Sequence, residues 1–276
     1  MASVGRMVHT HDVTISAGAV RKVYVSWDEG EPEREWAALV LLDREAPGLA
    51  PRPLGRDEQA GRPVVVMSEL PGRPLTDVVS VKQQRGLVDA LRRLFAIEVD
   101  DRLAERANGP SVLRGQLLEW FAESHDLARC EDSALVTRAV ARAREWLATD
   151  GEIVETITDP VIAVGDGNLD NVLWDGEQCR LIDFEEHGAS DLAFELADVV
   201  EHASSRLDRR LDVDAFLTAM RLDPPQRRRV DGYRRLMACL WLAILLPGNG
   251  GFDRNPPGST EDQARHLLAM LVDART

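Results

Sequence analysis

Two short apolar runs around a polar turn form the stretch of this sequence that most constrains its fold. NVLW and CRLID flank DGEQ, so residues 171–183 predict an antiparallel hairpin that reverses around Asp175 and Gly176. Turn chemistry explains these two residues. It does not explain why Asn171 and Asp183 place an amide and a carboxylate at the open end of a hairpin whose strands are apolar.

The first 70 residues are rich in strand signals. DVTIS and VRKVYVSW alternate around Ala17–Gly18, which predicts an antiparallel hairpin. GEPEREWAALVLLDREAPG predicts a helix of about four turns, because Pro32 and acidic residues stand near its start and Gly48 follows its end. Pro-rich irregular chain then leads to a predicted strand at Val64–Ser68, and Pro71–Gly72 ends it.

Helical patterns dominate the rest of the chain. Amphipathic segments are expected near residues 75–98, 111–128 and 132–149, and again from about Asp191 onward. The order of elements predicts an α+β fold with two lobes, a small antiparallel-sheet lobe at 1–70 and a larger, mainly helical lobe at 71–276. Clefts between lobes are favoured ligand sites.

The composition excludes several classes of protein. A formal net charge of −14 disfavours nucleic acid as a partner, since phosphate backbones require clustered Lys and Arg. The same charge would attract a cationic small molecule, or it reflects solubility alone. Cys130, Cys179 and Cys239 have neither disulfide nor zinc spacing, which indicates a reducing cytoplasm. The longest apolar run, Leu236–Leu246, is about half a bilayer span, so it predicts a buried helix and no membrane partner.

The polar residues of the hairpin have the chemistry of a metal site. We expect Asn171 and Asp183 to oppose each other, with Cα atoms about 4.5–5.5 Å apart. Two oxygen ligands at that spacing can share one Mg²⁺ ion, which completes its coordination with water and phosphate. Asp166 lies in a loop with Gly165 and Gly167, where its carboxylate would act as a base without binding the metal directly.

Each of these residues also has an ordinary explanation, because Asp and Asn are frequent in turns and loop caps. For any one residue taken alone, that explanation is preferred. The combination of Asp166, Asn171 and an Asp that closes the following hairpin favours a site for a metal-bound nucleotide.

This combination resembles the catalytic segment of the aminoglycoside phosphotransferase and choline kinase-like family, a branch of the protein-kinase fold. In that family a loop of pattern H-G-D-x-x-x-x-N precedes a metal-binding Asp that opens D-F or D-W, and this chain has VGDGNLDN and IDFEE. The resemblance implies that Asp166 is the catalytic base and that Asn171 and Asp183 bind magnesium. It also implies that Asp191, in SDLAFELADVVEH, supports the catalytic loop.

The resemblance extends into the first 70 residues. Lys22, in RKVYV, is similar to the strand lysine that holds the α- and β-phosphates of the nucleotide, and EREWAAL is similar to the helix whose Glu pairs with it. Helical periodicity allows either Glu33 or Glu35 to face inward, and the family position favours Glu35.

MSELPG resembles the segment that links the two lobes and binds adenine through its main chain. The resemblance implies that the Ser68 carbonyl and the Leu70 amide contact the base and that Met67 lines its pocket. Core packing is the alternative role for Met67.

The chain departs from the family pattern at two places. Val164 replaces the usual His before Gly-Asp and can neither donate nor accept a hydrogen bond. Only 21 residues precede Lys22, and SAGA has a single glycine, which leaves little room for a phosphate-covering loop. These departures motivate the alternative of a nucleotide-binding pseudokinase with a regulatory or scaffold role.

The resemblance implies an enzyme that moves the γ-phosphoryl group of ATP, with Mg²⁺, to a hydroxyl of a small molecule such as an aminoglycoside or another cationic antibiotic. A protein kinase is less favoured, because no A-P-E motif follows DFEE. Several acidic or polar residues either hold an amine-rich acceptor or form a solvated helix face with Asp198 and Glu201 outward. They are Glu185, Glu186, Glu195, Asp198, Glu201 and His202.

Overall fold

The computed structural model describes residues 11–27, 30–149, 156–207 and 211–273. The chain divides into two compact units that interleave along the sequence. Unit 1 comprises residues 1–107, 161–189 and 210–212, and unit 2 comprises 108–160, 190–209 and 213–276. The small sheet and the polar hairpin therefore belong to one unit, although residues 108–160 separate them in sequence. The lobe boundary near residue 70 remains a prediction.

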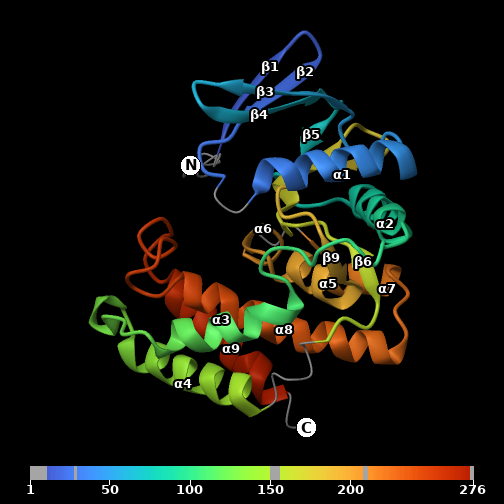
Figure 1. The fold of residues 1–276 in the computed structure, drawn as a ribbon. Coiled ribbons are helices and arrows are strands. Elements are labelled where there is room, and N and C mark those ends of the chain that lie inside the picture. Colours follow the sequence, from blue (N-terminus) through green and yellow to red (C-terminus); the bar gives the residue numbers. More distant parts are fainter. Residues whose placement is uncertain (1–10, 28–29, 150–155, 208–210, 274–276) are drawn as a thin grey trace. The chain divides into compact units, whose positions relative to one another are not determined.

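Unit 1 begins with a four-stranded antiparallel sheet in the order β1-β2-β4-β3 (Figure 1). Its strands are β1 (Asp12–Ser16), β2 (Ala19–Val23), β3 (Pro53–Gln59) and β4 (Arg62–Ser68). The hairpin expected at Ala17–Gly18 is present, and both turn residues have positive φ, 53° and 77°. That conformation matches the twist of the flanking strands.

The prediction of irregular chain before Val64 is wrong, because strand β3 lies there and pairs with β4. Its sequence, PLGRDEQ, has no alternation of apolar and polar residues, and most of the strand is exposed. An exposed edge strand needs no apolar face, and charged residues on it discourage pairing with other chains. Hydrophobic periodicity therefore carries no signal for this strand.

Helix α1 (Glu31–Glu45) has the predicted start, with Pro32 and two acidic residues in its first turn. Gly30 precedes it in a left-handed conformation, φ 83°. The helix packs against β3 and β4, as Figure 1 shows, and buries Ala38, Leu39 and Leu42 in that contact face. The same inward face carries Glu35, so the helix delivers a carboxylate to the interior.

A second sheet of unit 1 has the order β5-β7-β8, from β5 (Arg73–Pro74), β7 (Val172–Trp174) and β8 (Cys179–Leu181). The prediction that Asn171 and Asp183 lie opposite each other in the hairpin is wrong by one residue. Val172 pairs with Leu181, and the Ile182 amide donates to the Asn171 carbonyl at 3.0 Å. Because side chains alternate along a strand, this one-residue difference changes which side chain faces which.

Helix α2 (Val81–Phe95) packs on this hairpin. Ser80 and Gln83 cap its start reciprocally: the Ser80 hydroxyl accepts from the Gln83 amide, and the Gln83 side chain accepts from the Ser80 amide at 2.9 Å. Cys179 and Leu181 of β8 are buried. The hairpin is thus supported from one side by a well-capped helix.

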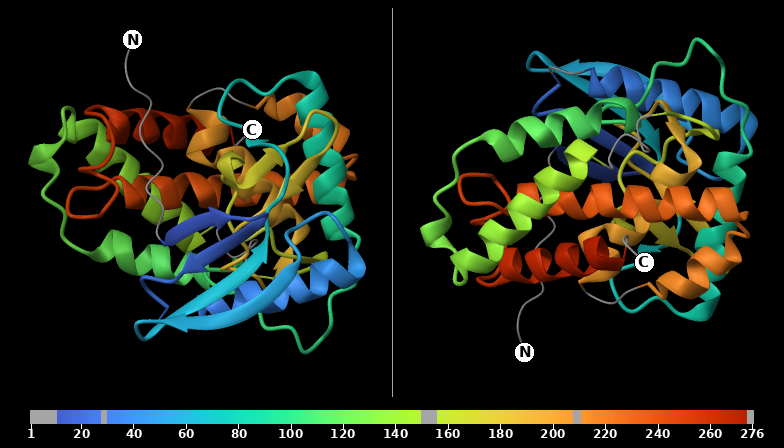
Figure 2. Two further views of the ribbon diagram at one scale, coloured as in Figure 1. Left: turned by 90° about the horizontal axis from the view of Figure 1, so that it is seen from above. Right: turned by 90° about the horizontal axis from the view of Figure 1, so that it is seen from below.

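Unit 2 is helical, as expected. Its helices are α3 (Pro110–Ala122), η1 (Leu127–Arg129), α4 (Ser133–Thr149), α5 (Leu192–Glu201), α6 (Ala203–Arg206), α7 (Val213–Ala219), α8 (Pro224–Ile244) and α9 (Ser259–Asp273). Helix α9 contacts both α4 and α8 (Figure 2). The apolar run Leu236–Leu246 is mostly buried in and just after α8, which confirms that prediction. Across the described part of the chain, no helix has both the length and the hydropathy needed to cross a membrane.

Three short elements complete the chain. They are η3 (Leu169–Asn171), which belongs to unit 1, and β6 (Pro160–Ile162) and β9 (Ala189–Asp191), which pair with each other. The segment 163–171 between β6 and β7 contains the predicted catalytic loop. The α+β fold class predicted from the sequence is confirmed.

Candidate active site

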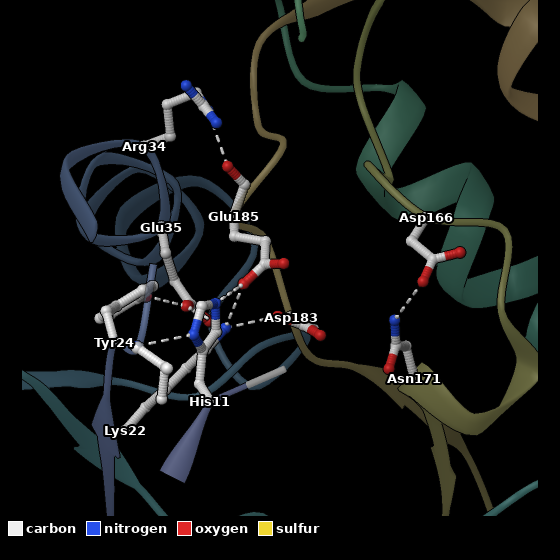
Figure 3. Close-up of polar contacts among 10 residues, drawn as sticks. His11, Lys22, Tyr24, Arg34, Glu35, Asp166, Asn171, Asp183 and Glu185 are labelled. Carbon is white, nitrogen blue, oxygen red and sulfur yellow. Dashed lines mark hydrogen bonds and ion pairs between the residues drawn. The ribbon is translucent and has the colours of Figure 1, made fainter. Parts of the chain in front are cut away.

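Lys22 lies on β2 in the interior of unit 1, with 7% of its surface exposed. Its Nζ donates to Glu35 Oε2 at 2.8 Å, to Asp183 Oδ1 at 2.6 Å and to Glu185 Oε2 at 2.8 Å (Figure 3). Burial alone would lower the pKa of this ammonium, but the three carboxylates outweigh burial and raise it. The lysine is therefore charged at every physiological pH.

Helix α1 supplies the lysine's partner, and the structure decides between the two glutamates that periodicity left open. Glu35 is 1% exposed, whereas Glu33 lies on the exposed face of the helix. The Tyr24 hydroxyl, which follows Lys22 on the same segment, also donates to Glu35 Oε2. Burial raises the pKa of the Glu35 carboxyl, and the Lys22 ammonium opposes that shift. Two donors thus compensate one buried carboxylate.

Glu185 joins this cluster, although the sequence placed it among the acids of the acceptor side. Its Oε2 contacts both Lys22 Nζ and His11 Nε2, each at 2.8 Å. Burial would raise the pKa of Glu185, but the bonds from His11 and Lys22 lower it to about 2. The Arg34 guanidinium donates to the Glu185 main-chain carbonyl at 2.7 Å, which fixes the segment after Asp183 to α1.

His11 has no counterpart in the sequence prediction. Its Nδ1 accepts from the Val25 amide at 3.2 Å, so Nε2 is the nitrogen that faces Glu185. The ring also packs against Tyr24, with centroids 4.6 Å apart. A single histidine before a strand carries no motif, and only the folded sheet brings it to Glu185.

Asp166 lies in the loop before η3. Its carboxylate accepts from the Asn168 amide at 3.0 Å and from the Asn171 side-chain nitrogen at 3.4 Å (Figure 3). Burial raises the pKa of Asp166 to about 6, and the negative charge of Asp183 contributes to that increase. Near neutral pH this carboxylate is largely ionised yet close to its pKa, which suits a group that accepts a proton.

Asp183 connects the two halves of the site. One of its carboxylate oxygens contacts Lys22, and its negative charge acts on Asp166. The residue has φ 69°, a left-handed backbone that is uncommon for Asp and typical of functional positions. Lys22 is therefore in direct contact with both Glu35 and Asp183, whereas Asn171 is in contact with Asp166.

Two sets of carboxylates and amides offer hard oxygen ligands to a cation. Glu35, Asp183 and Glu185 have ligand atoms within 4.8 Å of one another, but each of them contacts the Lys22 ammonium. The lysine already compensates that cluster. Asn171 carries an amide oxygen and contacts Asp166, and Asp183 carries a carboxylate; both are oxygen ligands of the kind that Mg²⁺ takes, so these two residues could hold it.

The segment predicted to bind adenine follows β4. Met67 is 5% exposed, within the sheet. The Arg52 amide donates to the Ser68 hydroxyl at 2.9 Å, and the Ser68 amide donates to the Arg52 carbonyl at 2.9 Å. Ser68 is thus tied to Arg52 through both its hydroxyl and its amide. Among the described residues the Leu70 amide has no hydrogen-bond partner.

In unit 2, Asp191 is fully buried at the start of α5 and caps that helix through the Ala193 amide at 2.9 Å. Its Oδ2 accepts from the Thr158 amide and from the Arg229 guanidinium, each at 2.8 Å. These contacts anchor the chain just before β6. The role of Asp191 in supporting the catalytic loop itself remains a prediction.

The alternative of a solvated helix face with Glu201 outward is wrong for that residue. Glu201 is 1% exposed and contacts Arg234 at 2.7 Å and His266 at 2.8 Å. Glu195 is also 1% exposed. Their carboxylates are held inside unit 2, so the acidic residues of α5 do not form one exposed patch.

Solved structures that this fold matches include small-molecule kinases. Choline kinase LicA from Streptococcus pneumoniae superposes with a TM-score of 0.64 at 14% identity, over 98% of this chain and 92% of that chain. A choline/ethanolamine kinase family protein from Mesorhizobium loti gives 0.63 at 16% identity, over 95% and 85%. Aminoglycoside phosphotransferase APH(3'')-Id from Streptomyces rimosus, in complex with ADP and streptomycin, gives 0.57 at 18% identity, over 81% and 87%.

These likenesses define a protein-kinase-like fold of the kind that small-molecule kinases have. The profile of the phosphotransferase enzyme family matches residues 19–234, so the chain belongs to that family and is a phosphotransferase. Comparison with curated proteins finds no match. The resemblance drawn from the catalytic segment is confirmed at the level of family and fold, whereas the role of each site residue remains a prediction.

Proposed function

We propose that this protein transfers the γ-phosphoryl group of ATP, in the presence of Mg²⁺, to a hydroxyl group of a small molecule. The contact of Lys22 with both Glu35 and Asp183 is the observation that carries this proposal. It joins a cation able to hold phosphates, the acid that fixes that cation and a candidate metal ligand within one unit.

In this proposal the residues of unit 1 mainly position and neutralise. Lys22, braced by Glu35, holds the α- and β-phosphates, and the main chain of Ser68 and Leu70 binds the base beside Met67. Asn171 and Asp183 would hold Mg²⁺, which supplies positive charge to the phosphate oxygens when bound.

Asp166 orients the acceptor hydroxyl and takes its proton as the new bond to phosphorus forms. A pKa of about 6 keeps this carboxylate mostly deprotonated at pH 7. It is also basic enough to share the proton in the transition state. The Asn168 amide and the Asn171 side chain hold the carboxylate in position.

The acceptor belongs to a class of small hydroxylated molecules, and a cationic one is favoured. The structural neighbours include kinases for choline, for ethanolamine and for streptomycin-type aminoglycosides, which all carry positive charge. A net charge of −14 supports attraction of such a molecule. Aminoglycoside antibiotics are therefore one candidate among several amine-bearing acceptors.

Replacement of Asp166 by Asn tests the proposed base. The variant keeps the shape of the side chain but cannot accept the proton, so kcat should fall by at least about 100-fold. ADP formation is followed across a panel of aminoglycosides, choline, ethanolamine and neutral sugars. Binding of Mg-ADP, measured by calorimetry, should change by less than about twofold because Asp166 is not proposed to contact the nucleotide.

Glu177→Gln provides the matched control, since Glu177 is exposed in the turn between β7 and β8. It should retain the turnover of the wild-type protein. Turnover by Asp166→Asn equal to that of Glu177→Gln would reject the role of Asp166.

The second candidate is a nucleotide-binding pseudokinase with a regulatory or scaffold role. Two observations favour it: Val164 stands where the family has His, and the turn between β1 and β2 has only two residues, Ala17 and Gly18. Saturable Mg-nucleotide binding without phosphorylated product from any acceptor would favour this candidate. Three free cysteines agree with the reducing cytoplasm expected for either protein.

A further inference from the structure

Val164 leaves an open question about how the catalytic loop is held. Its side chain is 9% exposed and has no polar group, so it cannot tether the loop as an imidazole at that position would. Asp166 follows two residues later. A loop that presents a base needs some other group to fix its backbone.

Arg106 provides such a group. It lies 60 residues before Asp166 in the sequence and directly follows Glu105, which pairs with Ala189. Its guanidinium donates to the Gly165 carbonyl at 2.5 Å and to Glu186 Oε2 at 2.6 Å. One planar cation therefore joins the loop before Asp166 to the segment that follows Asp183. All of these residues belong to unit 1.

The main chain around Arg106 is fixed on both sides. The Arg106 amide donates to the Ala189 carbonyl at 2.9 Å, and the Ala189 amide donates to the Ala104 carbonyl at 2.8 Å. Gly188 lies so close that a Cβ there would be 2.5 Å from the main-chain nitrogen of Arg106. The backbone from which the arginine side chain extends is therefore held in place, and the bonds to Gly165 and Glu186 hold its guanidinium.

The guanidinium also suits its surroundings better than other cations would. Arg106 is 6% exposed, and a buried cation requires several acceptors. Its carbonyl and carboxylate partners lie on different segments, 21 residues apart. Both bonds come from Nη2, and Nε donates to the Ala107 carbonyl at 3.3 Å, so one planar guanidinium serves three acceptors.

We propose that Arg106, paired with Glu186, is the positioning residue that holds the Gly165–Asp166 peptide in this chain, in place of the histidine that the family pattern has at position 164. The inference rests on the proposed function, since it assigns Arg106 to the reaction through Asp166. Arg106 itself is not proposed to touch nucleotide or acceptor. Glu186 secures the guanidinium and thereby ties the loop to the segment after Asp183.

The test compares Arg106→Met, Arg106→Lys and Glu186→Gln in the full chain. Misplacement of a base by about 1 Å can cost about 100-fold in rate, so Arg106→Met should lower kcat by about tenfold to 100-fold. KM for ATP should stay within about twofold, because the nucleotide contacts are unchanged. Arg106→Lys should recover part of the lost kcat, and Glu186→Gln should lower kcat less than Arg106→Met does.

Arg102→Met is the matched control. Arg102 lies four residues before Arg106, its side chain is 90% exposed, and it pairs with Asp100 on the surface. Its kcat, KM and amide exchange should equal those of the wild-type protein. Hydrogen exchange of peptides that cover residues 163–171 gives a second readout. Exchange there should be at least about fivefold faster in Arg106→Met than in Arg102→Met.

Wild-type kcat together with unchanged exchange in Arg106→Met would overturn the inference. Parallel loss of kcat, nucleotide binding and thermal stability in all three variants would also overturn it, since a purely structural role predicts that result. If the wild-type protein turns over no acceptor, the proposed function fails by itself. The exchange comparison then still decides whether Arg106 holds the loop.

Discussion

His187 is a buried histidine whose imidazole is poorly compensated. It is 4% exposed, and its Nδ1 has no hydrogen-bond partner among the described residues. Burial, with a contribution from the positive charge of Arg34, lowers the pKa of His187 to about 4. The folded protein therefore keeps this ring neutral over a range where the unfolded chain binds a proton.

This difference predicts a pH-dependent stability. Between pH 6.5 and 4 the unfolded state binds one proton more at His187, so the free energy of unfolding should fall as the pH falls through that window. The full linkage is worth about 3 kcal/mol, from about 1.36 kcal/mol per pKa unit. Urea unfolding of the wild-type protein and of His187→Leu at several pH values measures it.

His187→Leu removes the titrating ring and the unpaired nitrogen together. The difference in unfolding free energy between the two proteins should therefore move in favour of the variant as the pH falls from 6.5 to 4. A constant difference across this range would show that the ring is protonated equally in both states.

Some residues of the candidate site were accessible from the sequence and others were not. Glu35 was selected by family position, because periodicity permitted Glu33 equally. His11 and Arg106 were missed, since each meets its partner only after chain segments far apart in sequence come together. Neither lies in a motif, and a single His or Arg is more often an ordinary surface residue.

At the scale of elements, the fit between α2 and the β7–β8 hairpin is unusually close at Gly86. A Cβ on Gly86 would lie 2.8 Å from the Trp174 ring and 3.2 Å from Cys179 Sγ. The hairpin ends at Asn171 and near Asp183, so the packing of α2 sets the position of two predicted metal ligands.

Gly86→Ala should therefore destabilise the protein although alanine is the better helix former. Overpacking against a ring costs about 1–3 kcal/mol, which exceeds the gain of about 1 kcal/mol in helix propensity. We expect a lower urea midpoint and weaker Mg²⁺-dependent stabilisation by ADP, both measured by tryptophan fluorescence.

Gly115→Ala is the control for helix propensity, because Gly115 lies in α3 and a Cβ there would meet nothing within 4 Å. That variant should keep the urea midpoint or raise it, with a gain of up to about 1 kcal/mol in the free energy of unfolding. Equal shifts in the two variants would show that the space around Gly86 adapts without cost.

The elements that the sequence predicted have strong local signals, and those it missed have none. Helix α1 has its proline and acidic first turn, and the first hairpin has its Ala17–Gly18 turn. Strand β3 is exposed and charged, so it has no apolar alternation to detect. The one-residue error in the β7–β8 register arose because a polar turn fixes where a chain reverses only approximately.

At the scale of the whole molecule, the division into two units explains why the residues of the site cannot be brought together from any single stretch of the sequence. Unit 1 collects residues 1–107 and 161–189, and the long segment between them belongs to unit 2. Lys22 and Asp183 are 161 residues apart in sequence, and in the fold Lys22 Nζ lies 2.6 Å from Asp183 Oδ1. Spacing within one motif constrains only neighbouring residues, so the family pattern was needed to join these two.

Net charge gives a prediction that involves the entire molecule. With a formal charge of −14, the protein should attract a cationic acceptor over a distance set by the ionic strength. The Debye length shrinks from about 20 Å at 20 mM salt to about 7 Å at 200 mM. At saturating ATP, kcat/KM for a multiply charged acceptor should therefore fall at least about threefold over this range.

A neutral hydroxyl acceptor provides the control, because its association is not steered by charge and its kcat/KM should change by less than about 1.5-fold over the same salt range. Saturation with ATP matters, since repulsion of the anionic nucleotide would otherwise weaken with salt and oppose the effect. Initial rates of ADP formation with both acceptors measure the comparison. Equal salt dependence for the charged and the neutral acceptor would mean that the acidic surface serves solubility and does not guide the substrate.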